Sequence, residues 1–402
     1  MKEKNKRYVV LGASTGMTLV CGILYIWGVI SKALVEQLNW TSKEASLPYT
    51  VATISFVIAM VIFGDIQDKK GPRMIGTIGG FLMGFGLILS GLTLSPKMLI
   101  LSMGIISGCG IGILNVTTTP PAVKWFPPEK KGMITGIVVG GVSVSSMLYS
   151  PLANYLIKTQ SISKTFIVIG CIALCISVFL AQFLKNPPEE HDIKSQKGFL
   201  SNQGFTWKEM LKTKQFYMVW MMLGLSSSAG LMIIGHISNI AKVQAKWEGG
   251  FILVILLAIF NTLGRFLGGT ISDKIGRSSL MRIIFVMQGV NMFWFSQYNN
   301  VGLLAIGAAI AGLCYGATFS VFPATIADVY GMKNFGMNFG LMFTAWGFGG
   351  VIGPMTGAAI FDMIGNYNTA YLVSGSLLVL AFITTFIFDK SKKGIKIFSF
   401  DA

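Results

Sequence analysis

Arg265 is the residue whose type and position point most directly to chemistry. It lies in the middle of the apolar run Gly249–Ser272, beside Leu263 and Phe266. Burying a guanidinium in a membrane is costly, so such a residue faces a cavity or a partner and marks a functional site. Its planar fork of donors fits a carboxylate in bidentate fashion. We therefore predict that Arg265 binds a substrate carboxylate. The structural alternative is an ion pair with Asp273, two turns further on.

Other polar and aromatic residues in the apolar runs are candidates for the same site. Asn261 lies four residues before Arg265, so the two side chains point the same way on a helix. A neutral Asn carries no proton near neutral pH, whereas His236 could do so if it titrates near its ordinary pKa of about 6.5. The alternative is that His236 only forms structural hydrogen bonds. Further candidate lining residues, each of which could also be ordinary core, are Tyr25, Asn115, Tyr315, Phe319 and Trp346.

The sequence gives little support to a metal site or an enzyme. Its five cysteines lie inside apolar runs and are interpreted as small core hydrophobes. Cys171 and Cys175 share a helix face but have no nearby His, Asp or Glu. There are two histidines in all and no cluster of intramembrane carboxylates. We predict no metal, no cofactor and no enzymatic activity.

Composition indicates the class of protein. The chain has 402 residues, of which 53% are hydrophobic and 12% charged, against about 25% charged in soluble domains. This predicts an integral protein of the lipid bilayer. The net charge of +16 could suggest a nucleic-acid partner, but the charges form short clusters between apolar runs. We interpret them as topology signals and predict no nucleic-acid binding.

Twelve apolar runs are long enough to cross a bilayer, which takes about 20 residues. The first has 23 residues, too many for the core of a signal peptide, so we expect it to remain as a membrane helix. The ninth is short and begins near Arg282. The runs are Tyr8–Ile30, Ala45–Gly64, Met74–Leu94, Met98–Val123, Met133–Ile157, Thr165–Leu184, Phe216–Ala241, Gly249–Ser272, Leu280–Tyr298, Val301–Ala327, Phe335–Phe361 and Thr369–Phe388.

The distribution of Lys and Arg predicts the orientation. Of the 32 such residues, 24 fall on the side that holds both termini and 7 on the other, while Arg265 lies within a run. The positive-inside rule then places both termini in the cytoplasm. The long polar stretch 185–214 separates six runs from six, so we predict bundles over 1–184 and 215–402, with a short amphipathic piece near Phe205–Leu211.

The two halves repeat one plan. The segment Gly64–Gly71 (GDIQDKKG) returns as Gly269–Gly276 (GTISDKIG), 205 positions later. Gly132 and Gly336 lie at the starts of equivalent runs, 204 positions apart, and Pro151 and Pro354 follow in nearly the same register. Repeats of this kind are typical of transporters with two halves around a central site.

Twelve runs and the doubled G-x-x-x-D-x-x-G turn make the chain resemble the major facilitator superfamily. The resemblance implies an all-α membrane protein with two pseudo-symmetric six-helix bundles, active as a monomer. It also implies that Asp68 and Asp273 latch the cytoplasmic gate, with Arg73 and Arg277 beside them. The alternative is a solvated topology signal.

A narrower resemblance rests on the stretch Lys124–Pro127 (KWFP) followed by Lys131 and Gly132. It is similar to the oxalate/formate antiporter family, bacterial relatives of the monocarboxylate transporters. That family pairs an Arg in the eighth helix with a Lys in the eleventh, where this chain has Trp346. A dianion is best held by two cations, so the resemblance implies a site for one carboxylate. Animal monocarboxylate transporters usually carry Asp at the place of Asn261, which puts that route of proton coupling in doubt.

We therefore predict a secondary active transporter of small monocarboxylates such as lactate, pyruvate or formate. An oxalate/formate-type exchanger is the alternative within the same class, and a drug/proton antiporter is disfavoured because no Asp or Glu lies clearly mid-membrane. A non-transporting anion sensor is the alternative from another class, although the short tails leave little room for a signalling domain. The sequence leaves open the acid, the direction of flow and whether a proton is the coupling ion.

Overall fold

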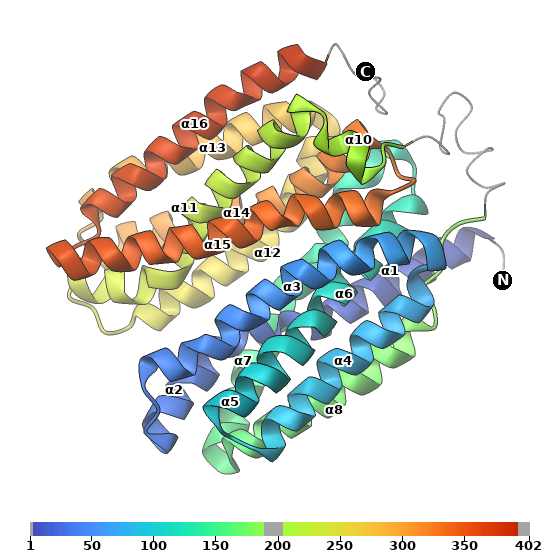
Figure 1. The fold of residues 1–402 in the computed structure, drawn as a ribbon. Helices are drawn as coiled ribbons and strands as arrows, with labels where there is room; N and C mark the ends of the chain where they lie inside the picture. Colours follow the sequence, from blue (N-terminus) through green and yellow to red (C-terminus); the bar gives the residue numbers. More distant parts are fainter. Residues whose placement is uncertain (1–2, 189–203, 393–402) are drawn as a thin grey trace. The chain divides into compact units, whose positions relative to one another are not determined.

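The computed structural model describes residues 3–188 and 204–392, which form helices joined by short turns (Figure 1). The chain divides into two compact units, and each unit takes in the start of a helix whose remainder belongs to the other. The predicted division at residues 184 and 215 stays a prediction. The first unit consists of Met1–Pro127, Val138–Gly204 and Met332–Leu341, and the second of Pro128–Ile137, Phe205–Gly331 and Met342–Ala402.

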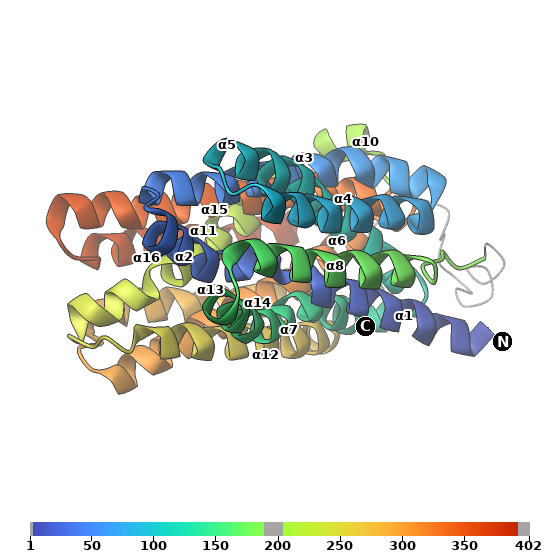
Figure 2. The same cartoon turned by 90° about the horizontal axis from the view of Figure 1, so that it is seen from below.

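In the first half of the chain, α4 packs against α6 and α8, and α3 packs against α6 (Figure 1 and Figure 2). The helix α7 begins in the second unit and continues in the first. The elements are α1 (Glu3–Val20), η1 (Gly22–Ile26), α2 (Trp27–Leu38), α3 (Ser42–Lys70), α4 (Pro72–Leu92), α5 (Pro96–Leu99), η2 (Ile100–Ser107), α6 (Gly108–Lys124), η3 (Pro128–Lys130), α7 (Lys131–Thr159) and α8 (Ile162–Ala181).

In the second half, α12 packs along α14, while α16 packs against α11 and α13. The helix α15 begins in the first unit and continues in the second. The elements are α10 (Trp207–Leu211), α11 (Lys214–Gln244), α12 (Gly250–Ile275), α13 (Arg277–Trp294), η4 (Phe295–Gln297), α14 (Val301–Tyr330), α15 (Phe335–Ile364) and α16 (Asn368–Lys392). The short α10 lies within the amphipathic piece predicted near Phe205–Leu211.

Eleven spans among the described residues are long and apolar enough to cross a membrane by length and composition. They correspond to eleven of the twelve predicted runs. The remaining run, the ninth, is α13, which is a helix of 18 residues. Its polar residues Gln288 and Asn291 are each 2% exposed. Together with Arg277 and Arg282 they lower the mean hydropathy of α13, which packs against α14 and α16.

The first predicted run is broken in the structure. We expected one helix over Tyr8–Ile30, but α1 ends at Val20 and a short 3₁₀ segment, η1, connects it to α2. At the break the amide of Gly22 donates a hydrogen bond of 3.1 Å to Ser145 Oγ. A side chain of a neighbouring helix thus satisfies a backbone group there, which allows the helix to change its winding.

The repeated turn of the sequence is also a repeat in the structure. Gly71 ends α3 with φ of 86° and Gly276 ends α12 with φ of 88°. Both values lie in the region that favours glycine. Each glycine amide donates to the carbonyl four residues earlier, and a new helix starts at the next residue. The sequence repeat therefore specifies two turns of the same conformation.

Glycines bring α12 and α14 into close contact. A Cβ on Gly264 would overlap the carbonyl of Leu313, and one on Gly316 would overlap the carbonyl of Asn261. Small residues at such crossings let helix backbones approach in membranes. The contact lies at the depth of Arg265, which is thereby held directly beside α14.

Candidate functional site

Arg265 lies midway along α12 and is 1% exposed, which makes it the largest fully buried side chain among the described residues. Its Nε donates to Oδ1 of Asn261 at 3.2 Å. Its guanidinium carbon lies 4.6 Å from the centre of the Phe319 ring. The predicted pairing of Arg265 with Asn261 along one helix face is therefore present in the structure.

Three aromatic residues extend the site from α14 to α15. The ring centres of Tyr315 and Phe319, one turn apart on α14, are 5.0 Å from each other. Trp346 of α15 donates its indole N–H to the Tyr315 hydroxyl at 2.9 Å, and its ring centre lies 6.3 Å from that of Phe319. The structure thus brings five predicted residues, Asn261, Arg265, Tyr315, Phe319 and Trp346, into one cluster within the second unit.

Phe343 belongs to the same cluster, although we did not predict it. Its ring centre lies 5.7 Å from that of Phe319 and 6.2 Å from that of Trp346. It precedes Trp346 by three residues, a spacing that places two side chains on one helix face. That spacing was the available sequence signal. The cluster is a buried cation with aromatic rings around it, and in such surroundings an anion is attracted far more strongly than in water.

His236 lies in a different part of the second unit. One ring nitrogen, Nε2, is 2.9 Å from the carbonyl oxygen of Pro354, and Nδ1 is 3.2 Å from the Tyr367 hydroxyl. Asn239 donates to the same hydroxyl. Pro354 lies two turns, about 12 Å, beyond Trp346 along α15. The structure therefore does not bring His236 to Arg265 through these contacts, and its role in proton transfer stays a prediction.

Two predicted residues belong to the first unit. Tyr25 lies in η1, and its side chain is outside the described part of the structure. Asn115 lies in α6, where its side-chain oxygen is buried without a hydrogen-bond partner among the described residues. A buried amide oxygen without a partner is costly, which is consistent with a group that meets a ligand or water. Both assignments stay predictions.

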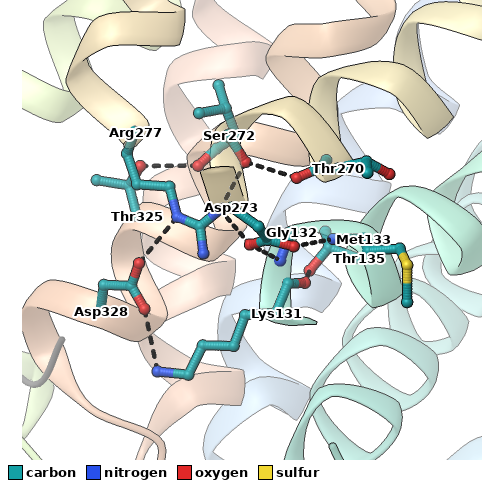
Figure 3. A network of polar contacts seen from close by, with 12 residues as sticks. Lys131, Gly132, Met133, Thr135, Thr270, Ser272, Asp273, Arg277, Thr325 and Asp328 are labelled. Atoms are coloured by element: carbon teal, nitrogen blue, oxygen red, sulfur yellow. Dashed lines mark hydrogen bonds and ion pairs between the residues drawn. The ribbon is translucent and has the colours of Figure 1, made fainter. Parts of the chain in front are cut away.

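A second group of polar residues surrounds Asp273 at the end of α12 (Figure 3). The Asp273 carboxylate accepts hydrogen bonds from the backbone amides of Gly132 and Met133, at 2.9 and 2.8 Å. These amides are in the first turn of α7, where the helix dipole favours a negative charge. Arg277 Nη1 donates to the same carboxylate at 2.6 Å. Asp273 is thus bound to α7 and to α13.

Two further charged residues join this group. Arg277 Nε donates to Asp328 at 2.9 Å, and Lys131 Nζ donates to the other oxygen of Asp328 at 3.0 Å. The four side chains alternate in sign and are only 7% to 12% exposed. Lys131 and Asp328 were not among the predicted gating residues. Their pairing joins residues 197 positions apart, and nothing in their local sequence indicated it.

Asp68, the equivalent of Asp273, is bound by the backbone amides of Gly336 and Met337 and by Lys124. It accepts a hydrogen bond of 2.9 Å from the backbone amide of Met337, in the first turn of α15. Its other oxygen lies 3.6 Å from Lys124 Nζ. Arg73 is exposed and does not take part within the described structure. Pro72 separates Arg73 from the turn glycine, whereas Arg277 follows its glycine directly, and one residue rotates a helical side chain by about 100°.

The chain matches the family model described as Major Facilitator Superfamily over residues 10–290 and 225–399. The oxalate:formate antiporter of Oxalobacter formigenes is 25% identical over 396 residues, which cover 98% of this chain and 94% of the relative. The uncharacterized MFS-type transporter YhjX of Escherichia coli is 27% identical over 349 residues, 86% of each chain. Monocarboxylate transporter 13 of Rattus norvegicus is 24% identical over 385 residues, 92% of this chain and 86% of the relative.

Solved structures show the same fold. The outward conformation of the transporter FucP, from Escherichia coli, superposes with a TM-score of 0.75 at 13% sequence identity. The match covers 95% of this chain and 99% of FucP. At this identity the likeness concerns the fold alone.

Proposed function

The chain belongs to the Major Facilitator Superfamily, and from this premise we propose that it carries a small organic monocarboxylate across the membrane by alternating access. Lactate, pyruvate and formate represent the class of substrate. The family match and the structural likeness confirm the predicted fold class, an all-α membrane protein with the major facilitator fold. The chain is thus a multi-pass membrane transporter, and its substrate, coupling and orientation are what we propose.

The observation that carries the proposal is the burial of Arg265 among aromatic rings. A guanidinium buried in a membrane segment marks a functional site, and its planar fork of donors fits a transported carboxylate. At an effective dielectric constant of about 20, the Coulomb attraction between a guanidinium and a carboxylate about 4 Å apart is about 4 kcal/mol. Asp273, the alternative partner considered from the sequence, accepts hydrogen bonds from Arg277 and from the start of α7.

The surroundings of Arg265 favour a small substrate with one charge. Phe319 covers the guanidinium, and Trp346 stands where the resemblance to oxalate/formate antiporters implies a second cation. An aromatic wall suits the short apolar part of a monocarboxylate. A second carboxylate at that wall would lose its hydration without gaining a cation.

Alternating access needs contacts that close one end of the transporter, and we assign this role to Asp68 and Asp273. Each binds the first turn of a helix, α15 or α7, through backbone amides. The unequal distribution of Lys and Arg supports both termini, and hence both contacts, on the cytoplasmic side of a bacterial membrane.

Uptake of labelled carboxylates into liposomes tests the anion site. We expect Arg265→Ala to abolish uptake and Arg265→Lys to retain part of it, because Lys keeps the charge but loses the bidentate fork. Leu267→Ala, on the lipid-facing side of the same helix, is the matched control and should transport normally. Wild-type rates in both Arg265 variants would refute the site. Binding of carboxylates without flux would favour a sensor.

Oxalate/formate-type exchange is the second candidate. Its support is the similarity to the Oxalobacter formigenes antiporter over nearly the whole chain. Counterflow separates the two: uptake only into liposomes loaded with anion favours exchange, whereas uptake into empty liposomes that is driven by a pH gradient favours proton symport.

A further inference from the structure

A small cavity lies inside the second unit, between α11, α13, α14 and α16. Every residue that lines it is buried. Its volume is about 10 Å³, counted as the space open to the centre of a water molecule. One buried water needs about 10–15 Å³ on this measure, so the cavity has the size of a single water. The lining residues are Ser226, Gly230, Ile284, Gln288, Cys314, Tyr315, Thr318 and Leu378.

The amide nitrogen of Gln288 is a buried donor at this cavity. The residue is 2% exposed, and its Nε2 has no hydrogen-bond partner among the described residues. Asn291 sets the orientation of the amide, because its Nδ2 donates to the Gly307 carbonyl at 3.0 Å and to Gln288 Oε1 at 3.3 Å. Oε1 is thus turned toward Asn291, which leaves Nε2 for the cavity. A buried N–H without an acceptor is costly, so we expect an acceptor there.

Two hydroxyl groups complete the polar lining of the cavity. Ser226 of α11 donates its hydrogen to the Leu223 carbonyl at 3.2 Å. Thr318 of α14 donates its hydrogen to the Cys314 carbonyl at 3.0 Å. Each hydroxyl has used its one donor and still offers lone pairs. A water matches this set, because it can accept from an amide and donate to two hydroxyl oxygens, whereas a cation would meet the N–H and an anion would meet lone pairs.

Tyr315 connects the cavity with the cluster around Arg265. Its ring lines the cavity and packs on α11, where a Cβ at Gly230 would come within 2.5 Å of it. The same residue contacts the Phe319 ring and accepts the hydrogen bond of Trp346. A water that joins α11, α13 and α14 beside Tyr315 therefore restrains the aromatic wall of the candidate anion site.

We propose that one water molecule binds to Gln288, Ser226 and Thr318 in this cavity, and that Gln288 acts through it as a positioning residue of Tyr315. The amide Nε2 donates to the water, and the water donates to the two hydroxyl oxygens, which gives the three hydrogen bonds usual for a buried water. The effect on substrate binding rests on the proposed function. The water site itself stands on the cavity and the buried amide.

Hydroxyl-radical labelling of the full-length protein tests the water site without substrate. Pulsed X-rays form hydroxyl radicals from water, bound water included, and the radicals label the side chains that they meet. Cys314 and Tyr315 line the cavity but are only 2% and 3% exposed. We expect both to be labelled, whereas Cys21 and Tyr371, buried elsewhere at 3% and 0% exposed, serve as unlabelled references. Labelling of Cys314 no higher than that of Cys21 would overturn the water site.

Variants then test the assignment to Gln288. Gln288→Met keeps the length of the side chain and removes the amide, so Cys314 should lose its label. Gln215→Met is the matched control, because Gln215 is a buried glutamine of the same unit that donates to the Ser391 carbonyl and does not line the cavity. Label that persists on Cys314 in Gln288→Met contradicts the assignment. If that variant does not fold, Thr318→Val, which removes one acceptor and keeps the shape, should cause the same loss and decides in its place.

Uptake into liposomes separates the positioning role from the water site. We expect Gln288→Met to raise the KM for the carboxylate and to keep most of the maximal rate, while Gln215→Met changes neither. Loss of the label with an unchanged KM would overturn the positioning role. An unmodified chain that is labelled at Cys314 but takes up no carboxylate would contradict the proposed function and support the water site.

Discussion

Replacing Trp346 with Lys should change the substrate from one charge to two. The ring of Trp346 lies next to that of Phe319, whose face the Arg265 guanidinium covers. A Lys at this position would place a second cation beside the Phe319 ring. A dianion such as oxalate could then meet one cation at each end, whereas a monocarboxylate would meet only Arg265.

The size of the effect follows from Coulomb's law. A distal carboxylate about 4 Å from the new ammonium gains about 4 kcal/mol at an effective dielectric constant of about 20. The repulsion between the two cations is the same with either substrate, so it lowers the stability of the variant but cancels from the preference. The gain of about 4 kcal/mol corresponds to a preference for oxalate that rises by up to about 700-fold.

The assay compares uptake of oxalate and of a monocarboxylate into liposomes for Trp346→Lys and Trp346→Met. Methionine has a flexible chain of similar length without the charge, so both variants lose the indole and its hydrogen bond to Tyr315. The ratio of the two substrates should rise for Lys only. An equal ratio in the two variants, with both proteins folded, would show that position 346 does not face the anion.

Three further predictions concern the turns, the helix contact and the histidine. Arg277→Ala should lower the stability of the purified protein by about 3–5 kcal/mol, because it leaves buried carboxylates without their cation. Replacing the exposed Arg73 with Ala should change the stability by less than about 0.5 kcal/mol. Equal shifts of the thermal unfolding midpoint in the two variants would contradict this prediction. Gly316→Ala should destabilise the protein by about 1–3 kcal/mol, because the new methyl group overpacks against α12. Gly235→Ala should be tolerated, because the nearest atom to its new Cβ would be 3.6 Å away. The midpoint of thermal unfolding measures both effects. His236→Gln should leave the KM for the carboxylate unchanged, and a raised KM would place the histidine at the substrate.

Contacts within one helix were the part of the site that sequence could predict. The spacing of four residues between Asn261 and Arg265, and between Tyr315 and Phe319, gave contacts that the structure contains. Such pairs follow from helix geometry alone. The repeated glycine turn was predictable for a similar reason, because a positive φ restricts the residue locally.

Contacts between helices were not predictable in the same way. The hydrogen bond from Trp346 to Tyr315 depends on how far α15 is rotated against α14, which one sequence does not specify. The pairing of Lys131 with Asp328 joins residues 197 positions apart, which no local pattern specifies. Arg73 was expected beside Asp68, but the extra residue Pro72 turns its side chain outward.

Asp68 and Asp273 recognise peptide N–H groups, and this has a consequence for how the sequence can change over time. The side chains of Met133 and Met337 play no part in those hydrogen bonds. Codons 133 and 337 can therefore drift among most amino acids without loss of the contact, so the two halves of the chain can diverge at these positions. Only proline, which has no peptide N–H, is excluded by the chemistry of recognition itself.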